Sequence, residues 1–388
     1  MTASGSRWIR CAKRPCWKSF GTAAKRLGRS GEGKLVMNAP ANPDPSFWEG
    51  RRVLLTGHTG FKGAWLAQWL KSMGAVVTGL SLGPLDGVSL WGKLGDDVID
   101  HSLTVDIRDA QATKAAVHDA NPQVILHLAA QSLVRASFDA PLDTFATNVM
   151  GTANLLDAAR GLTDCRAIVS VTSDKAYENR EQIWAYREDD PMGGHDPYSA
   201  SKGAAELITA SMRRSFFDGT QCGVASARAG NVIGGGDWAV DRLVPDCIRA
   251  FEAGEKVEIR NPAATRPWQH VLEPLAGYLV LAESLAAHPD EFAEGWNFGP
   301  RDEDVLPVEY IADTLVNLWG GDAAWFLTEG AHPHEAMALN VDATKAKHRL
   351  GWQPRLDLNT ALRWTVQWQR DLSNNKTAAQ ICKNQIKQ

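Results

Sequence analysis

From about residue 50 the chain alternates short apolar runs, rich in β-branched residues, with longer segments whose apolar positions recur at helical spacing. The apolar runs are residues 52–56, 75–80, 123–129, 167–173 and 224–228. Such alternation predicts parallel strands joined by helices. The first and third runs do not alternate apolar with polar positions, as expected when helices cover both faces of a sheet. The pattern predicts an α/β fold with a doubly wound parallel sheet over about residues 50–230.

Beyond Asn231 the pattern loosens into glycines, prolines and shorter helical segments at 243–253, 308–319 and 343–350. We expect a smaller, mixed α/β lobe here, which closes over the carboxyl ends of the strands, where ligands of such sheets bind. The predicted division is an extension with a linker at 1–46, a first domain at 47–230, a second lobe at 231–372 and a tail at 373–388. Some segments of the second lobe are expected to return to the first domain.

The first 36 residues differ from the rest, because they hold nine lysines and arginines against the single acid Glu32. Such a segment buries little apolar surface and is expected to be disordered. We favour a translation start at Met37, with a disordered tail as the other simple explanation; a transit peptide or a basic tail that touches nucleic acid are the remaining alternatives.

Composition narrows the classes of function. The 388 residues are 44% hydrophobic and have a formal net charge of -4, with both signs mixed through the body, so a nucleic acid is not an expected partner. No run approaches the roughly 18 apolar residues of a membrane span. The six cysteines form no CxxC pair, which argues against zinc and disulfides and favours a reducing cytoplasm. His332 and His334 flank a proline that breaks the helix of HExxH sites, so no metal is expected.

A glycine-rich string directly follows the first predicted strand and precedes a helix. Its residues are Gly57, His58, Thr59, Gly60, Phe61, Lys62 and Gly63. Three glycines at this spacing permit a tight turn, a close approach to a pyrophosphate and close packing of helix on strand, while the helix N-terminus favours negative charge. A glycine-rich turn without a ligand is the alternative. In this context we predict a Rossmann-like dinucleotide site.

The residues that would hold the ribose are less clear. The acid usual at the end of the second strand is missing, since Ser81, Leu82 and Gly83 follow that strand and Asp86 lies in the next loop. No arginine stands there to receive a 2′-phosphate, so NAD is favoured over NADP. Asp106 and Ile107, after the third strand, are expected beside the adenine, because Asp109 is better placed to cap the helix at 110–120.

Two polar clusters have the chemistry of an active site. Tyr198 and Lys202 share one face of a predicted helix, and a lysine together with a positive nicotinamide would lower the tyrosine pKa from about 10. Ser173 ends a strand, where it can hydrogen-bond a substrate hydroxyl, and Asp174 and Lys175 follow it. The simpler alternatives are a surface pair and a polar turn.

The order of several unusual strings resembles the CDP-glucose 4,6-dehydratases over nearly all of residues 47–368. The strings are TGxxGxxG, LAAQ at 128–131, TNVMGT at 147–152, TSDK at 172–175, YSASK at 198–202, RAGNVIGGGDW at 228–238 and RPWQHV at 266–271. The related dTDP-glucose dehydratases carry glutamate where this chain has Lys175, which favours CDP-glucose as the substrate. The resemblance implies an NAD-dependent enzyme of deoxysugar and surface polysaccharide synthesis.

The resemblance also implies roles for the catalytic residues. Tyr198, aided by Lys202 and Ser173, takes the proton of the 4-hydroxyl while C4 gives a hydride to NAD. Asp174 protonates the departing 6-hydroxyl, and the hydride returns to C6. Lys175 takes the C5 proton if its pKa is depressed; if it stays charged it stabilises the enolate instead, and another group is the base.

Further contacts follow from the same strings. Cofactor contacts are expected from Leu128, Ala129, Ala130, Gln131 and Asn148. Planar guanidinium groups suit pyrophosphate oxygens, and tryptophans can stack on a base or ribose. The expected substrate contacts are Asn231, Arg242, Arg266, His270 and either Trp238 or Trp268. The family pairs through helices like those predicted at 141–159 and 197–217, which implies a homodimer or homotetramer.

Three rival functions remain. A 4,6-dehydratase of dTDP-glucose or GDP-mannose would use the same catalytic groups. A nucleotide-sugar 4-epimerase would keep the glycines, Ser173, Tyr198 and Lys202, but would not need the pair of Asp174 and Lys175. An NAD-binding sensor would have no need of the tyrosine and lysine.

Overall fold

The computed structural model describes residues 41–83, 87–328 and 336–388. The basic extension before residue 41, the loop acid Asp86 and the segment with His332 and His334 lie outside the described residues. Within the described part no helix is both long enough and apolar enough to cross a membrane.

A seven-stranded parallel sheet forms the centre, with the strand order β11-β6-β5-β4-β1-β2-β3. Its strands are β1 (Arg52–Thr56), β2 (Val76–Ser81), β3 (His101–Thr104), β4 (Val124–His127), β5 (Ala167–Val171), β6 (Gly223–Ala229) and β11 (Gly295–Phe298). The order reverses between β1 and β4, and that point is where ligands of doubly wound sheets bind. The predicted α/β fold is confirmed, and β11 returns to the sheet from beyond residue 230.

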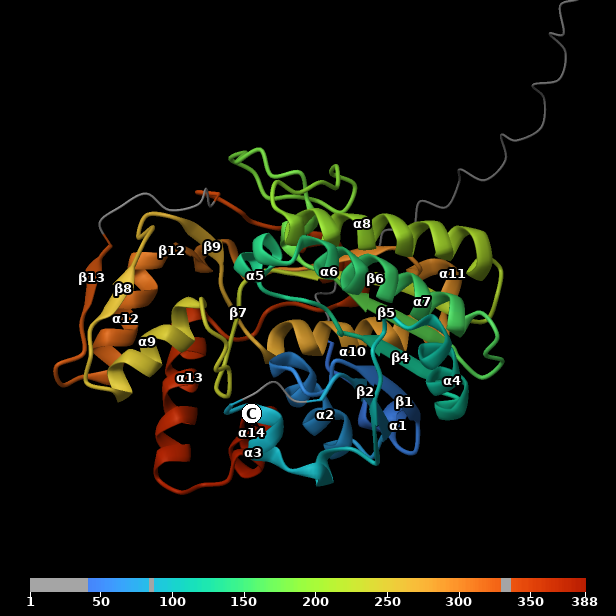
Figure 1. Cartoon of the computed structure of the whole chain (residues 1–388), viewed down its shortest axis with the longest axis horizontal. Coiled ribbons are helices and arrows are strands. Elements are labelled where there is room, and N and C mark those ends of the chain that lie inside the picture. Colours follow the sequence, from blue (N-terminus) through green and yellow to red (C-terminus); the bar gives the residue numbers. More distant parts are fainter. Residues whose placement is uncertain (1–40, 84–86, 329–335) are drawn as a thin grey trace, which may run out of the picture. The chain divides into compact units, whose positions relative to one another are not determined.

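Helices cover both faces of this sheet (Figure 1). On one face lie α2 (Phe61–Ser72), α3 (Leu90–Leu94), α10 (Leu272–Ala287), α11 (Pro289–Phe292) and α14 (Ala378–Lys387). On the other lie α4 (Ala110–Ala120), α7 (Gly151–Ala159) and α8 (Pro197–Met212). Val53 and Leu55 of β1 belong to the first core and Leu54 to the second, because successive residues of a strand point to opposite faces.

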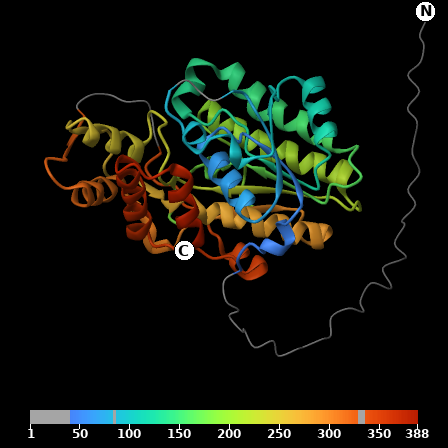
Figure 2. The same ribbon diagram turned by 90° about the horizontal axis from the view of Figure 1, so that it is seen from below.

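Smaller elements gather around a third core. The helices α9 (Leu243–Glu252), α12 (Val308–Trp319) and α13 (Leu358–Ser373) pack together there. Figure 2 shows these helices as yellow to red ribbons beside the sheet. Three two-stranded pairs accompany them, namely β7 (Val232–Ile233) with β10 (Gln269–His270), β8 (Val257–Ile259) with β13 (Trp325–Leu327), and β9 (Thr265–Pro267) with β12 (Val305–Pro307).

The remaining elements are short. They are α1 (Pro45–Trp48), α5 (Val134–Asp139) and α6 (Pro141–Phe145), with turns of 3₁₀ or π type at η1 (Asp96–Val98), η2 (Ala146–Met150), η3 (Asp174–Ala176), η4 (Arg213–Phe217), η5 (Asp302–Asp304) and η6 (Ala346–Leu350). α6, η2 and α7 follow one another without a break. Together they span the helix predicted at 141–159, with a π-type turn in its middle.

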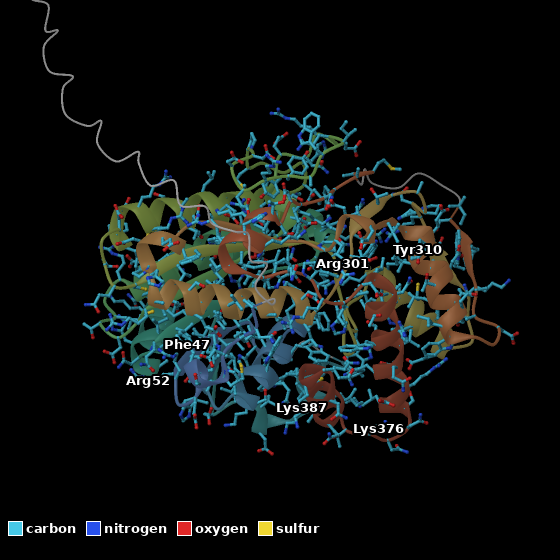
Figure 3. The ribbon with its side chains drawn as sticks, turned by 180° about the vertical axis from the view of Figure 1, so that it is seen from behind. Phe47, Arg52, Arg301, Tyr310, Lys376 and Lys387 are labelled. Atoms are coloured by element: carbon cyan, nitrogen blue, oxygen red, sulfur yellow. The ribbon has the colours of Figure 1, made fainter. Side chains whose placement is uncertain are left out.

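The last residues form a packed helix where the sequence predicted a tail. In α14 the side chains of Ile381 and Cys382 are buried, and the helix contacts α2 and α3. The indole N–H of Trp368 on α13 donates to the sulfur of Cys382 over 3.4 Å. Figure 3 labels Lys376, just before this helix, and Lys387 at its end. The apolar positions of α14 therefore complete the first core.

Candidate active site

A cavity of about 960 Å³ lies at the carboxyl ends of the central strands. Most of the residues singled out from the sequence line it. They are Gly57, Thr59, Gly60, Phe61, Lys62, Gly63, Asp106, Ile107, Leu128, Ala129, Ala130, Ser173, Asp174, Lys175, Tyr198, Lys202, Asn231, Arg242, Arg266 and Trp268. One cavity thus holds the glycine loop, both polar clusters and the arginines.

The glycine loop has the shape of a dinucleotide cradle. Gly57 has φ +74, and a Cβ added there would lie 2.8 Å from the backbone nitrogen of Ala129. A Cβ on Gly63 would lie 2.0 Å from the carbonyl oxygen of Gly57. Only glycine permits these approaches, which leave the N-terminus of α2 open to the cavity. Unpaired backbone N–H groups at that point suit a pyrophosphate.

The end of β2 offers hydroxyl groups where an acid was looked for. The hydroxyls of Thr59 and Ser81 lie 2.9 Å apart, and Ser81, Leu82 and Gly83 line the cavity. The sequence showed these residues after the strand, but hydroxyl groups in a loop are too common to single them out. No cation for a 2′-phosphate is found among these four residues.

Two expected cofactor contacts lie behind the cavity wall rather than in it. The side-chain oxygen of Asn148 accepts a hydrogen bond of 2.8 Å from the backbone N–H of Gln131, and its amide donates to Ser201 over 2.8 Å. The Gln131 amide donates to Thr144 over 3.0 Å. These bonds brace the loop after β4 against α6, η2 and α8.

At the adenine end, Asp106 lines the cavity and forms a 2.6 Å ion pair with Arg108. The Arg108 hydrogen bonds lower the pKa of this carboxyl. Asp109 instead caps α4 by accepting from the backbone N–H groups of Gln111 and Ala112 over 2.9 and 3.0 Å. The structure thus separates the lining acid from the capping acid.

Tyr198 and Lys202 lie one turn apart at the start of α8, and both are buried. The Asp196 carboxylate caps this helix by accepting from Ser199 N over 2.9 Å. Burial lowers the pKa of Lys202 to about 8, against the opposing charge of Glu206, and its ammonium donates to the Val171 carbonyl over 3.3 Å. The pair of Tyr198 and Lys202, called the dyad below, therefore carries a positive charge on Lys202 at neutral pH.

In the protein alone, the pKa of Tyr198 lies above its ordinary value. Burial raises the pKa of Tyr198 to about 12, although a hydrogen bond from Ser173 opposes the shift. In the protein alone, the free-energy cost of burying a phenolate exceeds the stabilisation that neighbouring charges and hydrogen bonds provide. Lowering this pKa requires a further positive charge in the cavity.

The Ser173-Asp174-Lys175 turn presents a buried carboxyl group whose pKa lies above its ordinary value. Ser173 caps η3 by accepting from Lys175 N over 3.2 Å, and its hydroxyl donates to Asp174 Oδ1 over 3.0 Å. Burial raises the pKa of Asp174, against the charges of Lys175 and Arg266. Its Oδ2 has no hydrogen-bond partner among the described atoms. A buried acid with one oxygen unsatisfied suits transfer of a proton to a ligand.

Two arginines and a tryptophan that were expected to bind the substrate line the cavity. Arg242 pairs with Asp237 over 2.9 Å and donates to the Ser132 hydroxyl over 3.3 Å. Arg266 is buried and donates to the Thr265 carbonyl over 2.8 Å. Trp268 is buried as well, and its indole N–H donates to Leu306 O over 3.1 Å.

Two expected substrate contacts lie elsewhere. His270 is fully buried, with its ring edge-on to Trp65 and Trp364 at centroid distances of 6.2 and 5.7 Å, and it does not line the cavity. Burial lowers its pKa to about 3. Trp238 packs edge-on against Trp368 at 5.8 Å. Aromatic packing between α2 and α13 places both rings in the first core.

A buried ion pair that the sequence did not single out lies behind the dyad. The Glu206 carboxylate, one turn beyond Lys202, accepts from Arg228 over 2.8 Å, from Ser226 over 2.5 Å and from the hydroxyl of Thr172. Burial raises the pKa of Glu206, but the charge and hydrogen bond of Arg228 lower it further, below its ordinary value. The only hint in the sequence was an arginine in an otherwise apolar strand.

Arg228 is completed by a second set of bonds. Its guanidinium donates to Tyr177 Oη over 2.7 Å and to the Glu188 carbonyl over 3.1 Å. Tyr177 in turn donates to Asn297 of β11 over 2.7 Å. The network joins α8 to β5, β6 and β11, the elements on which the catalytic turn and the dyad stand.

We predict that Arg228→Met lowers the free energy of unfolding by about 3–5 kcal/mol at neutral pH, because it leaves the Glu206 charge buried without a partner. Urea denaturation measures this loss. The double variant Glu206→Gln with Arg228→Met removes the charge too and should regain most of the stability. Equal loss in the single and double variants would contradict the prediction, because removal of the unpaired Glu206 charge would then restore no stability.

Comparison with known proteins agrees with this geometry. A model of the GDP-mannose 4,6 dehydratase family matches residues 54–295. The CDP-glucose 4,6-dehydratase of Salmonella typhimurium is 50% identical over 332 residues, which cover 84% of this chain and 92% of that protein. The UDP-glucose 4-epimerase of Mycolicibacterium smegmatis is 29% identical, and the aligned part covers 83% of this chain and 99% of that protein.

Among solved structures, the dTDP-glucose 4,6-dehydratase of Bacillus anthracis in complex with NAD has a TM-score of 0.69 at 21% identity, over 83% of this chain and 97% of that one. It supports the fold. Because the family model spans more than half of the chain and a relative is 50% identical over 84% of it, this chain belongs to the GDP-mannose 4,6-dehydratase family.

Proposed function

We propose that this chain is an NAD-dependent nucleotide-sugar 4,6-dehydratase that converts CDP-glucose into CDP-4-keto-6-deoxyglucose. The observation that carries the proposal is the meeting of Tyr198, Lys202 and Ser173 with the buried acid Asp174 in one cavity. A dehydrogenase needs only the first three groups. The acid adds the means to expel water. The 50% identity to a CDP-glucose 4,6-dehydratase supports the choice of nucleotide and sugar.

The cavity fits a nicotinamide dinucleotide. The close approaches at Gly57 and Gly63 leave room for a pyrophosphate at the start of α2, and Thr59 and Ser81 offer hydroxyls to a ribose. Without a cation at the end of β2, NAD fits better than NADP. When bound, NAD accepts a hydride from C4 of the sugar and returns it to C6.

Tyr198 is the group that takes the proton of the 4-hydroxyl. Its pKa of about 12 in the protein alone is too high for a base at neutral pH. The ammonium of Lys202 and the positive nicotinamide ring both stabilise a phenolate. The hydroxyl of Ser173 bonds the same phenol and orients the sugar oxygen. The tyrosine therefore becomes a base only in the loaded enzyme.

Asp174 is the acid for the 6-hydroxyl. Because burial raises its pKa, the carboxyl holds a proton more readily than an exposed aspartate does. Lys175 lines the same wall beside it, facing the step at C5. A neutral Lys175 would take the C5 proton, whereas a charged one would stabilise the enolate that forms when that proton leaves.

We assign the binding of the substrate diphosphate to Arg242 and Arg266. Arg242 and Arg266 line the cavity with guanidinium groups, which suit phosphate oxygens, and Asn231 lines the same cavity. The cavity continues along α9 and β8, where Leu243, Val257 and Ile259 line it, and this apolar end suits a nucleobase.

A nucleotide-sugar 4-epimerase is the second candidate, because the UDP-glucose 4-epimerase of Mycolicibacterium smegmatis is 29% identical to this chain. The buried acid argues against it. An epimerase only removes and returns hydride at C4, so a proton donor for a departing 6-hydroxyl would have no task.

We propose a reducing cytoplasm as the setting, because the six cysteines form neither CxxC pairs nor the dense spacing of a disulfide framework. The product, a ketone beside a new methyl group, suits a later reductase or aminotransferase. Such a series of reactions supplies deoxysugars, which the family resemblance connects with surface polysaccharides.

Incubation with CDP-glucose, dTDP-glucose and GDP-mannose in separate reactions tests the proposed substrate. We expect the near-ultraviolet absorbance that a 4-keto-6-deoxy sugar develops in alkali with CDP-glucose alone. Absorbance with another donor would keep the dehydratase and refute the nucleotide. No absorbance with any donor, in protein that binds NAD, would favour the epimerase.

Tyr198→Phe should lower kcat by about 10²–10⁴-fold, since the general base is lost while the cavity keeps its shape. Steady-state rates with CDP-glucose, together with the Kd of the substrate, separate catalysis from binding. Tyr310→Phe is the matched control, because its phenol bonds Asn359 outside the cavity over 3.0 Å. Equal rates in both variants would exclude Tyr198 as the base.

We further propose that the chain forms a homodimer, or a homotetramer built from such dimers, through the helices α6 to α8. Five large apolar side chains are exposed on this surface, namely Leu142, Phe145, Met150, Leu207 and Phe216. Leu142→Glu with Leu207→Glu should lower the mass measured by light scattering to that of one chain. Leu327→Glu, at an equally apolar exposed site on β13, should not. A wild-type monomer would refute the proposal.

A further inference from the structure

Two loops from distant parts of the chain meet at the cavity and are bonded to each other. The first runs from β4 into α5, and the second leads into α9. Arg135 of α5 forms an ion pair of 2.8 Å with Asp241. Arg242 donates to the hydroxyl of Ser132 over 3.3 Å. All four residues line the cavity. These two bonds, called the strap below, tie the sheet side of the cavity to the elements of the third core.

The strap determines where the guanidinium of Arg242 lies. Arg242 directly follows Asp241 and is the N-cap residue of α9, so a shift of one moves the other. The backbone of Asp241 is left-handed, with φ +61, which is uncommon for a residue other than glycine and persists only where surrounding contacts hold it. The ion pair with Arg135 is such a contact. A second acid, Asp237, pairs with Arg242 over 2.9 Å.

The same guanidinium also acts on the catalytic phenol. Burial raises the pKa of Tyr198 to about 12, and a hydrogen bond from Ser173 and the positive charge of Arg242 oppose this shift. Further titratable groups surround this phenol, namely Asp174 of η3, Asp196, Lys202 of α8 and Tyr278 of α10. Displacement of Arg242 alone would therefore make the phenol harder to ionise.

Stability alone does not explain the strap. The side chains of Arg135 and Asp241 are 44% and 40% exposed, and ion pairs at such exposed positions contribute little to folding. A guanidinium that is already held in place, in contrast, loses less conformational freedom when it binds a phosphate. The strap therefore has its largest effect on ligands that reach Arg242.

We propose that Arg135 is a positioning residue for the substrate: through Asp241 it holds Arg242 where that guanidinium meets the substrate diphosphate and stays close to Tyr198. The inference rests on the proposed function, because it takes a nucleoside diphosphate sugar as the substrate. It adds to that function a residue that acts through an ion pair and does not itself touch the reacting sugar.

The test compares Arg135→Gln with the wild type in steady-state turnover of CDP-glucose and in titration calorimetry with CDP, which has the diphosphate but no sugar. We expect KM and the Kd of CDP to rise about fivefold, because Arg242 leaves the place where it meets the diphosphate. The kcat at its optimal pH should change by no more than about twofold. The pH at which kcat falls to half on the acidic side should move upward, because Tyr198 loses part of the positive charge beside it.

Two variants separate positioning from a general defect. Arg135→Lys keeps the positive charge and should restore most of the affinity for CDP. Arg52→Gln breaks an ion pair of similar exposure, the 2.7 Å pair with Asp164, and neither of these residues lines the cavity. This control should match the wild type in KM, in the Kd of CDP and in the pH profile.

A double-mutant cycle with Asp241→Asn tests the ion pair itself, since asparagine tolerates a left-handed backbone. If Arg135 acts through Asp241, the double variant should lose no more affinity for CDP than Arg135→Gln alone. Additive losses, or a wild-type KM and pH profile in Arg135→Gln, would overturn the inference. A wild type that binds CDP but forms no keto sugar would instead refute the proposed function, and the Kd values would still decide on the strap.

Discussion

The buried ion pair between Glu206 and Arg228 is the constraint on which the catalytic geometry depends. Taking two charges out of water costs several kcal/mol for each ion unless every lone pair and proton is matched. Glu206 meets that condition with Ser226 and Arg228 of β6 and with Thr172, which directly follows the neighbouring strand β5. Because α8 can satisfy its glutamate only in one register, Tyr198 and Lys202 are held in one position above the strand ends.

The same pair fixes the turn that follows β5. Thr172, which bonds Glu206, directly precedes Ser173, and the hydroxyl of Ser173 bonds the side chains of Tyr198 and Asp174. The acid and the base of the proposed reaction are thus placed by one rigid polar network. Burial raises the pKa of both groups, so each of them gains its negative charge less readily than it would in water.

Patterns that depend on neighbours in sequence could be predicted, and those that depend on distant packing could not. The unbroken apolar runs of β1 and β4 indicated a sheet covered on both faces, and the glycine string indicated the turn after β1, since both signals are local. His270 looked like a substrate ligand within its string, but its side chain fills a gap between Trp65 and Trp364, from helices far away in sequence. Gln131 and Asn148 were expected on the cofactor and instead bond each other. Glu206 was missed because a glutamate in a predicted helix is normally expected to be exposed. The sequence does not show that Arg228 of β6 is its partner.

The helix α14 also bears on how the chain is made. It packs on α2, the helix that begins in the glycine loop, so a helix synthesised late covers a helix synthesised early. Domains tend to fold as they leave the ribosome, N-terminal part first. Until α14 has been synthesised, the face of α2 that it covers stays exposed to solvent. The edge strand β11 is also synthesised late. Early release of the chain, or a stop codon shortly before α14, would therefore leave the dinucleotide cradle with a bare apolar flank, which is a substrate for chaperones and proteases rather than a working half-enzyme.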